Sequence, residues 1–91
     1  EENEQPAIDW SLYPNPAKDF VSFEFNSPRA TFVSIELYNI QGQLVKTLLR
    51  DRIKPGVNRF SFSTQPLSPG IYILKITGQD GLLLQDRVIK Q

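Results

Sequence analysis

Apolar and polar residues alternate through four stretches of the chain, at residues 20–26, 32–39, 57–63 and 71–77. Successive side chains of a strand point to opposite faces, so this alternation predicts strands with one buried and one solvated face. Two rougher apolar runs predict strands with a mixed face, at residues 43–50 and 82–89. Residues 43–52 also fit a helix, with Leu44 and Leu48 four positions apart, but the β-branched Val45 and Thr47 favour a strand.

Turn-forming residues separate these runs. Pro14 and Pro16 each fix φ and lack an N–H, and Gly42 and Gly70 supply a positive φ where a turn requires one. Further turn signals lie at residues 27–29, 55–56 and 79–81. Short strands separated by frequent turns predict an all-β fold, and we expect a single immunoglobulin-like antiparallel β-sandwich of about seven strands.

The polar start of the chain differs from the rest. Residues 1–9, EENEQPAID, are acidic and show no periodicity, so we predict a linker at 1–9 and one folded domain at 10–91. A chain of 91 residues buries about 60–65% of the surface that it exposes when unfolded, which is enough for one modest core. Because the sequence does not begin with Met, we expect it to be part of a longer protein.

The charges are balanced, with ten Lys and Arg residues against ten Asp and Glu residues. This balance gives no electrostatic basis for binding nucleic acid or an anionic membrane surface. The basic cluster at residues 50–54 also contains Asp51, and we expect it to lie on a solvated loop. No apolar run approaches the roughly 18 residues that a membrane-spanning helix needs, so no span is predicted.

The chain contains no His and no Cys, which excludes the commonest catalytic triads, Cys–His pairs and His-based metal sites. Carboxylates are present, but at predicted turns or on polar strand faces, where such charges are usually solvated. They include Asp19, Glu24, Glu36, Asp51, Asp80 and Asp86. We therefore predict no enzymatic activity, no metal site and no cofactor.

Aromatic residues offer one alternative function. A stacking platform for sugars could form from Trp10, Tyr13, Phe32, Tyr38 and Tyr72. Phe is nevertheless the commonest aromatic residue, and Phe suits a core better than a polar ligand surface. A carbohydrate-binding or purely structural β-sandwich module of a larger secreted protein is therefore the alternative to the function described next.

Four motifs follow one another along the chain, at residues 12–17 (LYPNPA), 35–45 (IELYNIQGQLV), 67–76 (LSPGIYILKI) and 87–91 (RVIKQ). In this order and spacing they resemble the type A C-terminal sorting domain of the type IX secretion system, also called the Por secretion system. The resemblance covers about residues 11–91. The motif residues expected to build the fold are Tyr13, Pro14, Asn15, Pro16, Gly42, Gly70 and Tyr72.

The resemblance implies a non-catalytic signal at the C-terminus of a cargo protein. Its implied partners are the outer-membrane translocon and shuttle proteins of the type IX system, and a sortase-like protease that cleaves in or upstream of residues 1–10. The implied location is the periplasm in transit, then the outer-membrane surface or the medium.

We expect the machinery to contact the end of the chain, at Arg87, Val88, Ile89, Lys90 and Gln91. We also expect the last strand, residues 82–89, to lie at or near a sheet edge, where a partner could add its own strand. The same edges could pair two copies of the chain, so the prediction leaves a homodimer open. Deletion of residues 87–91 should then block export.

Overall fold

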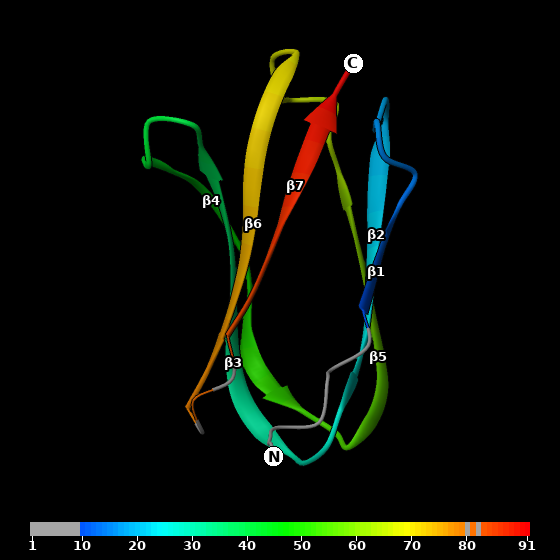
Figure 1. Cartoon of the computed structure of the whole chain (residues 1–91), viewed down its shortest axis with the longest axis vertical. Helices are drawn as coiled ribbons and strands as arrows, with labels where there is room; N and C mark the ends of the chain where they lie inside the picture. The colour runs from blue at the N-terminus through cyan, green and yellow to red at the C-terminus, as the bar shows by residue number, and fades with distance from the viewer. Residues whose placement is uncertain (1–9, 80, 82) are drawn as a thin grey trace, which may run out of the picture.

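The computed structural model describes residues 10–79, 81 and 83–91, which form two antiparallel sheets packed face to face (Figure 1). The seven strands are β1 (Trp10–Tyr13), β2 (Phe20–Ser27), β3 (Thr31–Asn39), β4 (Leu44–Ile53), β5 (Gly56–Ser63), β6 (Gly70–Gly78) and β7 (Leu83–Lys90). The predicted all-β sandwich of about seven strands is confirmed. The helix considered for residues 43–52 is wrong, because that segment forms β4. The predicted linker 1–9 and the turn position Asp80 lie outside the described residues.

One sheet has the strand order β1-β2-β5 and the other has the order β4-β3-β6-β7. Constant immunoglobulin domains place strands A, B, E and D in one sheet and C, F and G in the other. When β1 to β7 are matched in order to strands A to G, the two arrangements differ only at the fourth strand. β4 pairs with β3, whereas strand D pairs with strand E. The immunoglobulin-like label stays a prediction, since this shared strand order alone does not establish it.

The core lies between the two sheets and follows the predicted alternation. Every second residue of β3 from Thr31 to Leu37 is buried, and β6 shows the same period at Tyr72, Leu74 and Ile76. Phe25 of β2 is among the largest fully buried side chains, and burying such a side chain stabilises the fold by about 1.5–3 kcal/mol. The sandwich is therefore held together mainly by the inward faces of β2, β3 and β6.

The turn between β3 and β4 is built by Asn39 and Gly42. The Asn39 side-chain oxygen accepts hydrogen bonds from the backbone N–H groups of Gln41 and Gln43, both at 3.0 Å. The predicted positive φ is confirmed at Gly42, with φ of +84°, and at Gly70, with φ of +153°, although Gly70 is the first residue of β6 and not part of a turn. Since no atom lies within 4 Å of a Cβ built at Gly42, the turn requires glycine there for its φ angle rather than for space.

Candidate functional site

The last strand, β7, is an edge strand of the four-stranded sheet. It pairs with β6 in antiparallel register, with Tyr72 opposite Val88 and Ile73 opposite Arg87. The expected edge position of the C-terminal strand is therefore confirmed. In Figure 1 the C-terminus lies at the end of the sandwich where β6 begins, in agreement with the pairing of Gly70 with Lys90.

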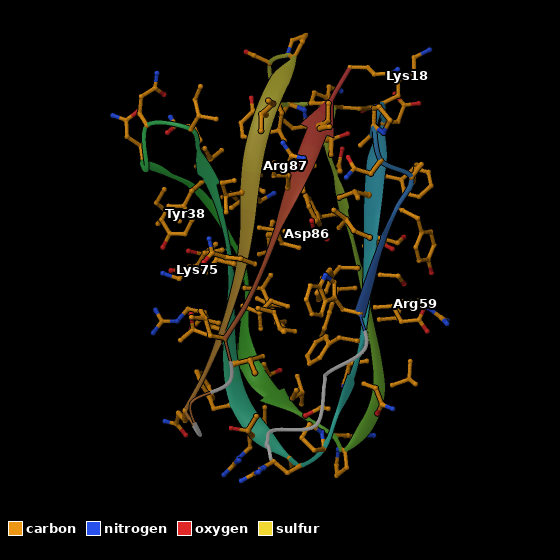
Figure 2. The ribbon with its side chains drawn as sticks, viewed as in Figure 1. Lys18, Tyr38, Arg59, Lys75, Asp86 and Arg87 are labelled. Atoms are coloured by element: carbon orange, nitrogen blue, oxygen red, sulfur yellow. The ribbon has the colours of Figure 1, made fainter. Side chains whose placement is uncertain are left out.

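The five terminal residues do not share one environment. Val88 is fully buried in the core, and Lys90 donates from Nζ to the Lys18 carbonyl oxygen. Arg87 is exposed and Ile89 is half-buried, and alternation places both on the outer face of the sheet, opposite to Val88. Figure 2 labels Arg87 next to Asp86 on β7. Of the predicted contact residues, Val88 thus has no side-chain surface to offer a partner.

Arg87 and Ile89 have apolar neighbours on β6. The strand register sets Ile71 opposite Ile89 and Ile73 opposite Arg87, and cross-strand partners share a face of the sheet. Ile71 is 42% exposed. This group of three isoleucines and one arginine, which we call the terminal patch, consists of Ile71, Ile73, Arg87 and Ile89.

The outer edge of β7 contacts the segment between β1 and β2. Asn15 Nδ2 donates to the Arg87 carbonyl oxygen, and the Ile89 N–H donates to Asn15 Oδ1, both at 2.9 Å. The backbone of Ala17 continues this contact: its N–H donates to the Ile89 carbonyl oxygen at 2.6 Å, and its carbonyl oxygen accepts from Gln91 N–H at 2.8 Å. Ala17 is completely buried there. Asn15 therefore has a second role that its turn propensity did not predict.

Asp86 completes the contact toward the middle of β7. Its Oδ1 accepts from the Arg87 N–H at 2.8 Å, and its Oδ2 accepts from Trp10 Nε1 at 3.1 Å. Since Trp10 belongs to β1 and Asp86 to β7, this hydrogen bond joins the edges of the two sheets. Sequence analysis grouped Asp86 with the carboxylates expected to be solvated, because nothing in its rough strand distinguishes a half-buried acid that binds Trp10 from a solvated one.

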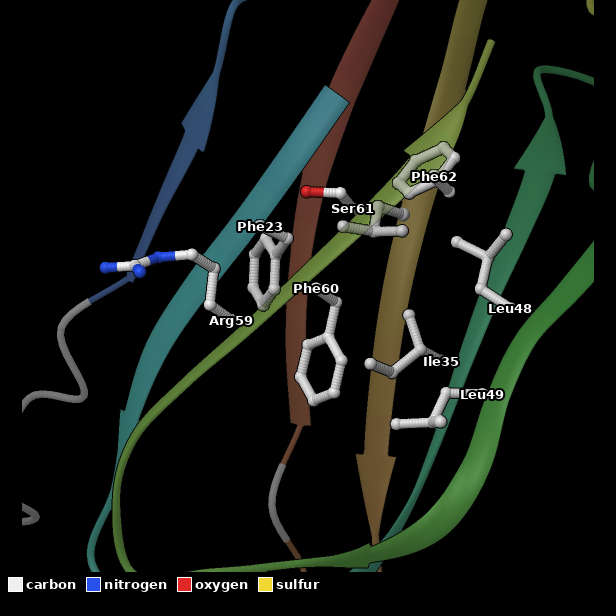
Figure 3. A pocket seen from close by; sticks show the side chains of 9 residues that line it. Phe23, Ile35, Leu48, Leu49, Arg59, Phe60, Ser61 and Phe62 are labelled. Atoms are coloured by element: carbon white, nitrogen blue, oxygen red, sulfur yellow. The ribbon is translucent and has the colours of Figure 1, made fainter. Parts of the chain in front are cut away.

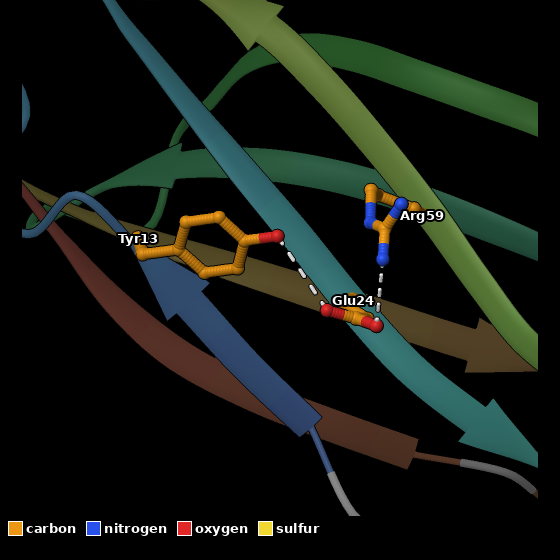
Figure 4. Close-up of polar contacts among 3 residues, drawn as sticks. All are labelled: Tyr13, Glu24 and Arg59. Carbon is orange, nitrogen blue, oxygen red and sulfur yellow. Dashed lines mark hydrogen bonds and ion pairs between the residues drawn. The ribbon is translucent and has the colours of Figure 1, made fainter.

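The remaining motif residues stabilise the sheets. Tyr13 donates from its hydroxyl to Glu24 Oε1 at 3.5 Å, and Glu24 Oε2 forms an ion pair with Arg59 Nη2 at 3.1 Å (Figure 4). The hydrogen bond and the charge of Glu24 raise the pKa of Arg59 above its usual value. Tyr72 is buried, and its hydroxyl donates to the Ser68 carbonyl oxygen at 2.7 Å. Tyr72 thereby ties the connection before β6 to the core, as the tyrosine corner of immunoglobulin folds does.

The aromatic residues do not form one platform. Trp10 pairs with Phe25 and Tyr13 pairs with Ser22, so the two side chains point to opposite faces of β1. Tyr38 lies on the other sheet, where Lys75 Nζ is 5.9 Å from its ring centroid, and Tyr72 is in the core. The sugar platform considered from sequence is therefore not assembled from these residues.

An apolar groove of about 340 Å³ opens between the edges of β4 and β5, on the side of the sandwich away from β7 (Figure 3). Its lining includes Leu48 and Leu49 from β4, Phe60 and Phe62 from β5, and Arg59. The two lateral sides of the sandwich therefore differ. Hydrogen bonds from the segment 10–18 close the side at β1 and β7, whereas the side at β4 and β5 is hollowed.

Within the described part of the chain, no three acidic side chains gather where they could hold a metal ion. No helix that is long and apolar enough to cross a membrane occurs among the described residues.

The profile of the secretion system C-terminal sorting domain matches residues 11–91 of the 91-residue chain. The chain belongs to this family. A search of the curated proteins returns no match. The match runs from the second residue of β1 to the end of the chain and includes both sides of the contact between Asn15 and β7. This family is a sorting signal of the type IX secretion system and not a catalytic family, so the chain is a non-catalytic sorting domain. It directs secretion through the outer membrane to the cell surface or the exterior.

Proposed function

We propose that the outer-membrane translocon and shuttle proteins of the type IX system recognise this domain in its folded state, through the terminal patch. The observation that carries the proposal is the outward position of Arg87 and Ile89 at the edge of the sandwich, beside Ile71 and Ile73. The outer face of an antiparallel sheet is commonly polar, so a group of isoleucines there is unusual. Exposed apolar groups with a polar rim are typical of protein contact sites.

The proposal includes the later steps of sorting. The domain would pass through the periplasm attached to its cargo, and a sortase-like protease would cut in or upstream of residues 1–10 after translocation. The family membership supports these steps, because a sorting domain acts on a cargo protein that must reach the outer membrane and cross it, and the domain is no longer needed after the crossing. Most of the proposed cleavage segment lies outside the described residues.

A reporter fusion tests the proposal. Residues 1–91 are placed behind a periplasmic reporter with an export signal, in a host that has the type IX system. We expect the reporter at the cell surface or in the medium, and in the periplasm when the translocon is deleted. Retention of the wild-type fusion in the periplasm of the competent host would contradict the sorting function and would favour a structural or carbohydrate-binding module.

A matched pair of variants then tests the terminal patch. Ile71→Glu places a negative charge in the patch. Val57→Glu introduces the same charge in place of an exposed β-branched residue of β5, which is 63% exposed. We expect export to fail for Ile71→Glu and to continue for Val57→Glu, with both domains folded by circular dichroism. Equal export of the two folded variants would show that the machinery does not contact the patch.

Pairing of two copies through the free sheet edges stays a prediction. Sedimentation velocity of the purified chain over a concentration series measures it directly, and a mass that stays at one copy per particle would contradict it.

A further inference from the structure

An edge strand presents backbone groups that have no partner in its own sheet. In an antiparallel pair, residues alternate between those that bond to the neighbouring strand and those whose N–H and C=O point away from it. In β7 the backbone bonds of Arg87 and Ile89 run to residues outside β6, so these residues point away from that strand. By the same alternation, the backbone groups of Leu83 and Gln85 also face the outer edge.

Asn15 occupies this edge as a peptide group would. A side-chain amide carries the same donor and acceptor as a peptide bond. The Asn15 amide uses both, with two equal distances of 2.9 Å to the Arg87 carbonyl oxygen and the Ile89 N–H. A neighbouring strand would offer this pair of contacts, but here one side chain supplies them.

The flanking residues show why a side chain is used. Residues 14–16, with the φ angles of Pro14 and Pro16 fixed, form a bend, so the backbone at Asn15 does not run along β7 as a regular strand. Among the described residues of this segment, backbone pairing with β7 occurs only at Ala17, which forms an isolated parallel bridge with Lys90. The Asn15 amide binds the backbone groups that lie between this bridge and the N–H of Arg87, which donates to the Asp86 side chain.

Together these contacts occupy half of the β7 edge. The outward backbone groups that have partners are Arg87 N–H, Arg87 C=O, Ile89 N–H, Ile89 C=O and Gln91 N–H. Toward the other end of the strand, no described strand pairs with the outer side of Leu83 and Gln85.

We propose that Asn15 is a positioning residue of the sorting signal, because its amide fixes residues 87–91 on the sheet and closes this half of the β7 edge to strand addition. The proposal rests on the sorting function argued above. Its consequence is that the secretion machinery reads the side chains of Arg87 and Ile89 in a fixed orientation and does not add a strand to the backbone of residues 87–91. Strand addition at β7 is restricted to Leu83 and Gln85.

Hydrogen exchange of the purified chain tests the contact without any secretion assay. Asn15→Ala removes the acceptor of the Ile89 N–H, and we expect its exchange to become about tenfold faster. Asn58→Ala is the matched control, since the Asn58 side-chain amide on β5 also makes two hydrogen bonds to the backbone, with Nδ2 donating to the carbonyl oxygens of Lys54 and Gly56. We expect this control to leave the exchange of Ile89 unchanged. Unchanged exchange of Ile89 in Asn15→Ala would overturn the proposal.

Asn15→Asp gives a second test if the alanine variant does not fold. An aspartate still accepts from the Ile89 N–H but sets a negative charge against the Arg87 carbonyl oxygen, where the native amide donates. We expect faster exchange of Gln91 in this variant, because the end of the strand separates from the segment at Ala17. Exchange of Gln91 at the wild-type rate would count against the proposal.

The reporter fusion tests the positioning role. We expect Asn15→Ala to lower export about tenfold, while Asn58→Ala exports like the wild type even where it lowers Tm by the same amount. A purely structural role of Asn15 would instead make export follow Tm in both variants, which would overturn the proposal, as would increased export of Asn15→Ala. Failure of the wild-type fusion would contradict the sorting function itself and would leave the exchange result to decide the role of Asn15.

Discussion

Substitutions at the adjacent residues Val88 and Ile89 allow the stability of the domain and its recognition by the secretion machinery to be measured separately. Val88 is fully buried and Ile89 lies half-buried on the opposite face. Val88→Ala removes two methyl groups from the core. At about 0.8 kcal/mol for each buried methyl-sized group, plus the energy of the remaining cavity, we expect a loss of about 2–3 kcal/mol in the free energy of unfolding. Ile89→Ala should cost about 1 kcal/mol or less, because its side chain is only partly removed from water.

These losses translate into measurable shifts. In a domain of this size, 1 kcal/mol corresponds to about 4–8 °C in Tm, so Val88→Ala should lower Tm by about 10–20 °C. Urea denaturation gives both free energies, and an unchanged m value shows that the change lies in stability.

Export should rank the two variants in the opposite order. At a temperature where both domains are folded, we expect Val88→Ala to be exported like the wild type and Ile89→Ala to be retained, because only Ile89 faces outward. Loss of export in folded Val88→Ala together with normal export of Ile89→Ala would refute the placement of the signal on the outer face.

Three further predictions concern the motif residues and their surroundings. Tyr72→Phe leaves the Ser68 carbonyl oxygen without its donor, and urea denaturation should show a loss of about 1–2 kcal/mol; a loss below the error of the measurement would contradict a role for the hydroxyl. Gly42→Ala should lower stability by about 1–2 kcal/mol through its φ of +84°, and a crystal structure of the variant should show no displaced neighbour; an unchanged Tm would exclude strain at this turn. Hydrogen bonding to Glu36 raises the pKa of Tyr38, so this interaction stabilises the folded state below pH 10 and is lost as the pH rises through the raised pKa. Absorbance titration of the phenol should give a lower pKa in Glu36→Gln, and an equal pKa in both proteins would refute the assignment.

The strands that line the core could be predicted from the sequence, because one face of each is buried along its whole length. Burial alternates in β3 with the same period as its apolar residues. β4 could be predicted only roughly. It lies at a sheet edge, most of its residues are exposed, and irregularities at Ile35/Glu36 and Leu37/Tyr38 shift its register against β3. With no consistently buried face, the apolar residues of β4 need not keep a period of two.

The role of Asn15 shows what local patterns cannot predict. Its neighbours Pro14 and Pro16 indicate an interruption between strands, and the structure has a bend there, but its hydrogen-bond partner Arg87 is 72 residues away. Nothing in the periodicity of either segment specifies that contact, since it depends on how the two sheets bring β1 and β7 together. The sequence therefore predicts that the first and the last motifs are functionally important, but only the structure shows that they contact each other.

This contact changes how a truncation of the sorting signal should be interpreted. Deletion of residues 87–91 removes the core residue Val88 and, at the same step, the backbone groups that Asn15 and Ala17 bind. The first and the last motifs of the chain are thus two halves of one contact, and neither can be removed without disturbing the other. Loss of export in the truncated domain would therefore have two explanations: the machinery has lost the residues that it contacts, or the edge of the sandwich has lost its structure. Substitutions confined to the outer face, at Ile71, Arg87 or Ile89, keep both halves of the contact and test the signal alone.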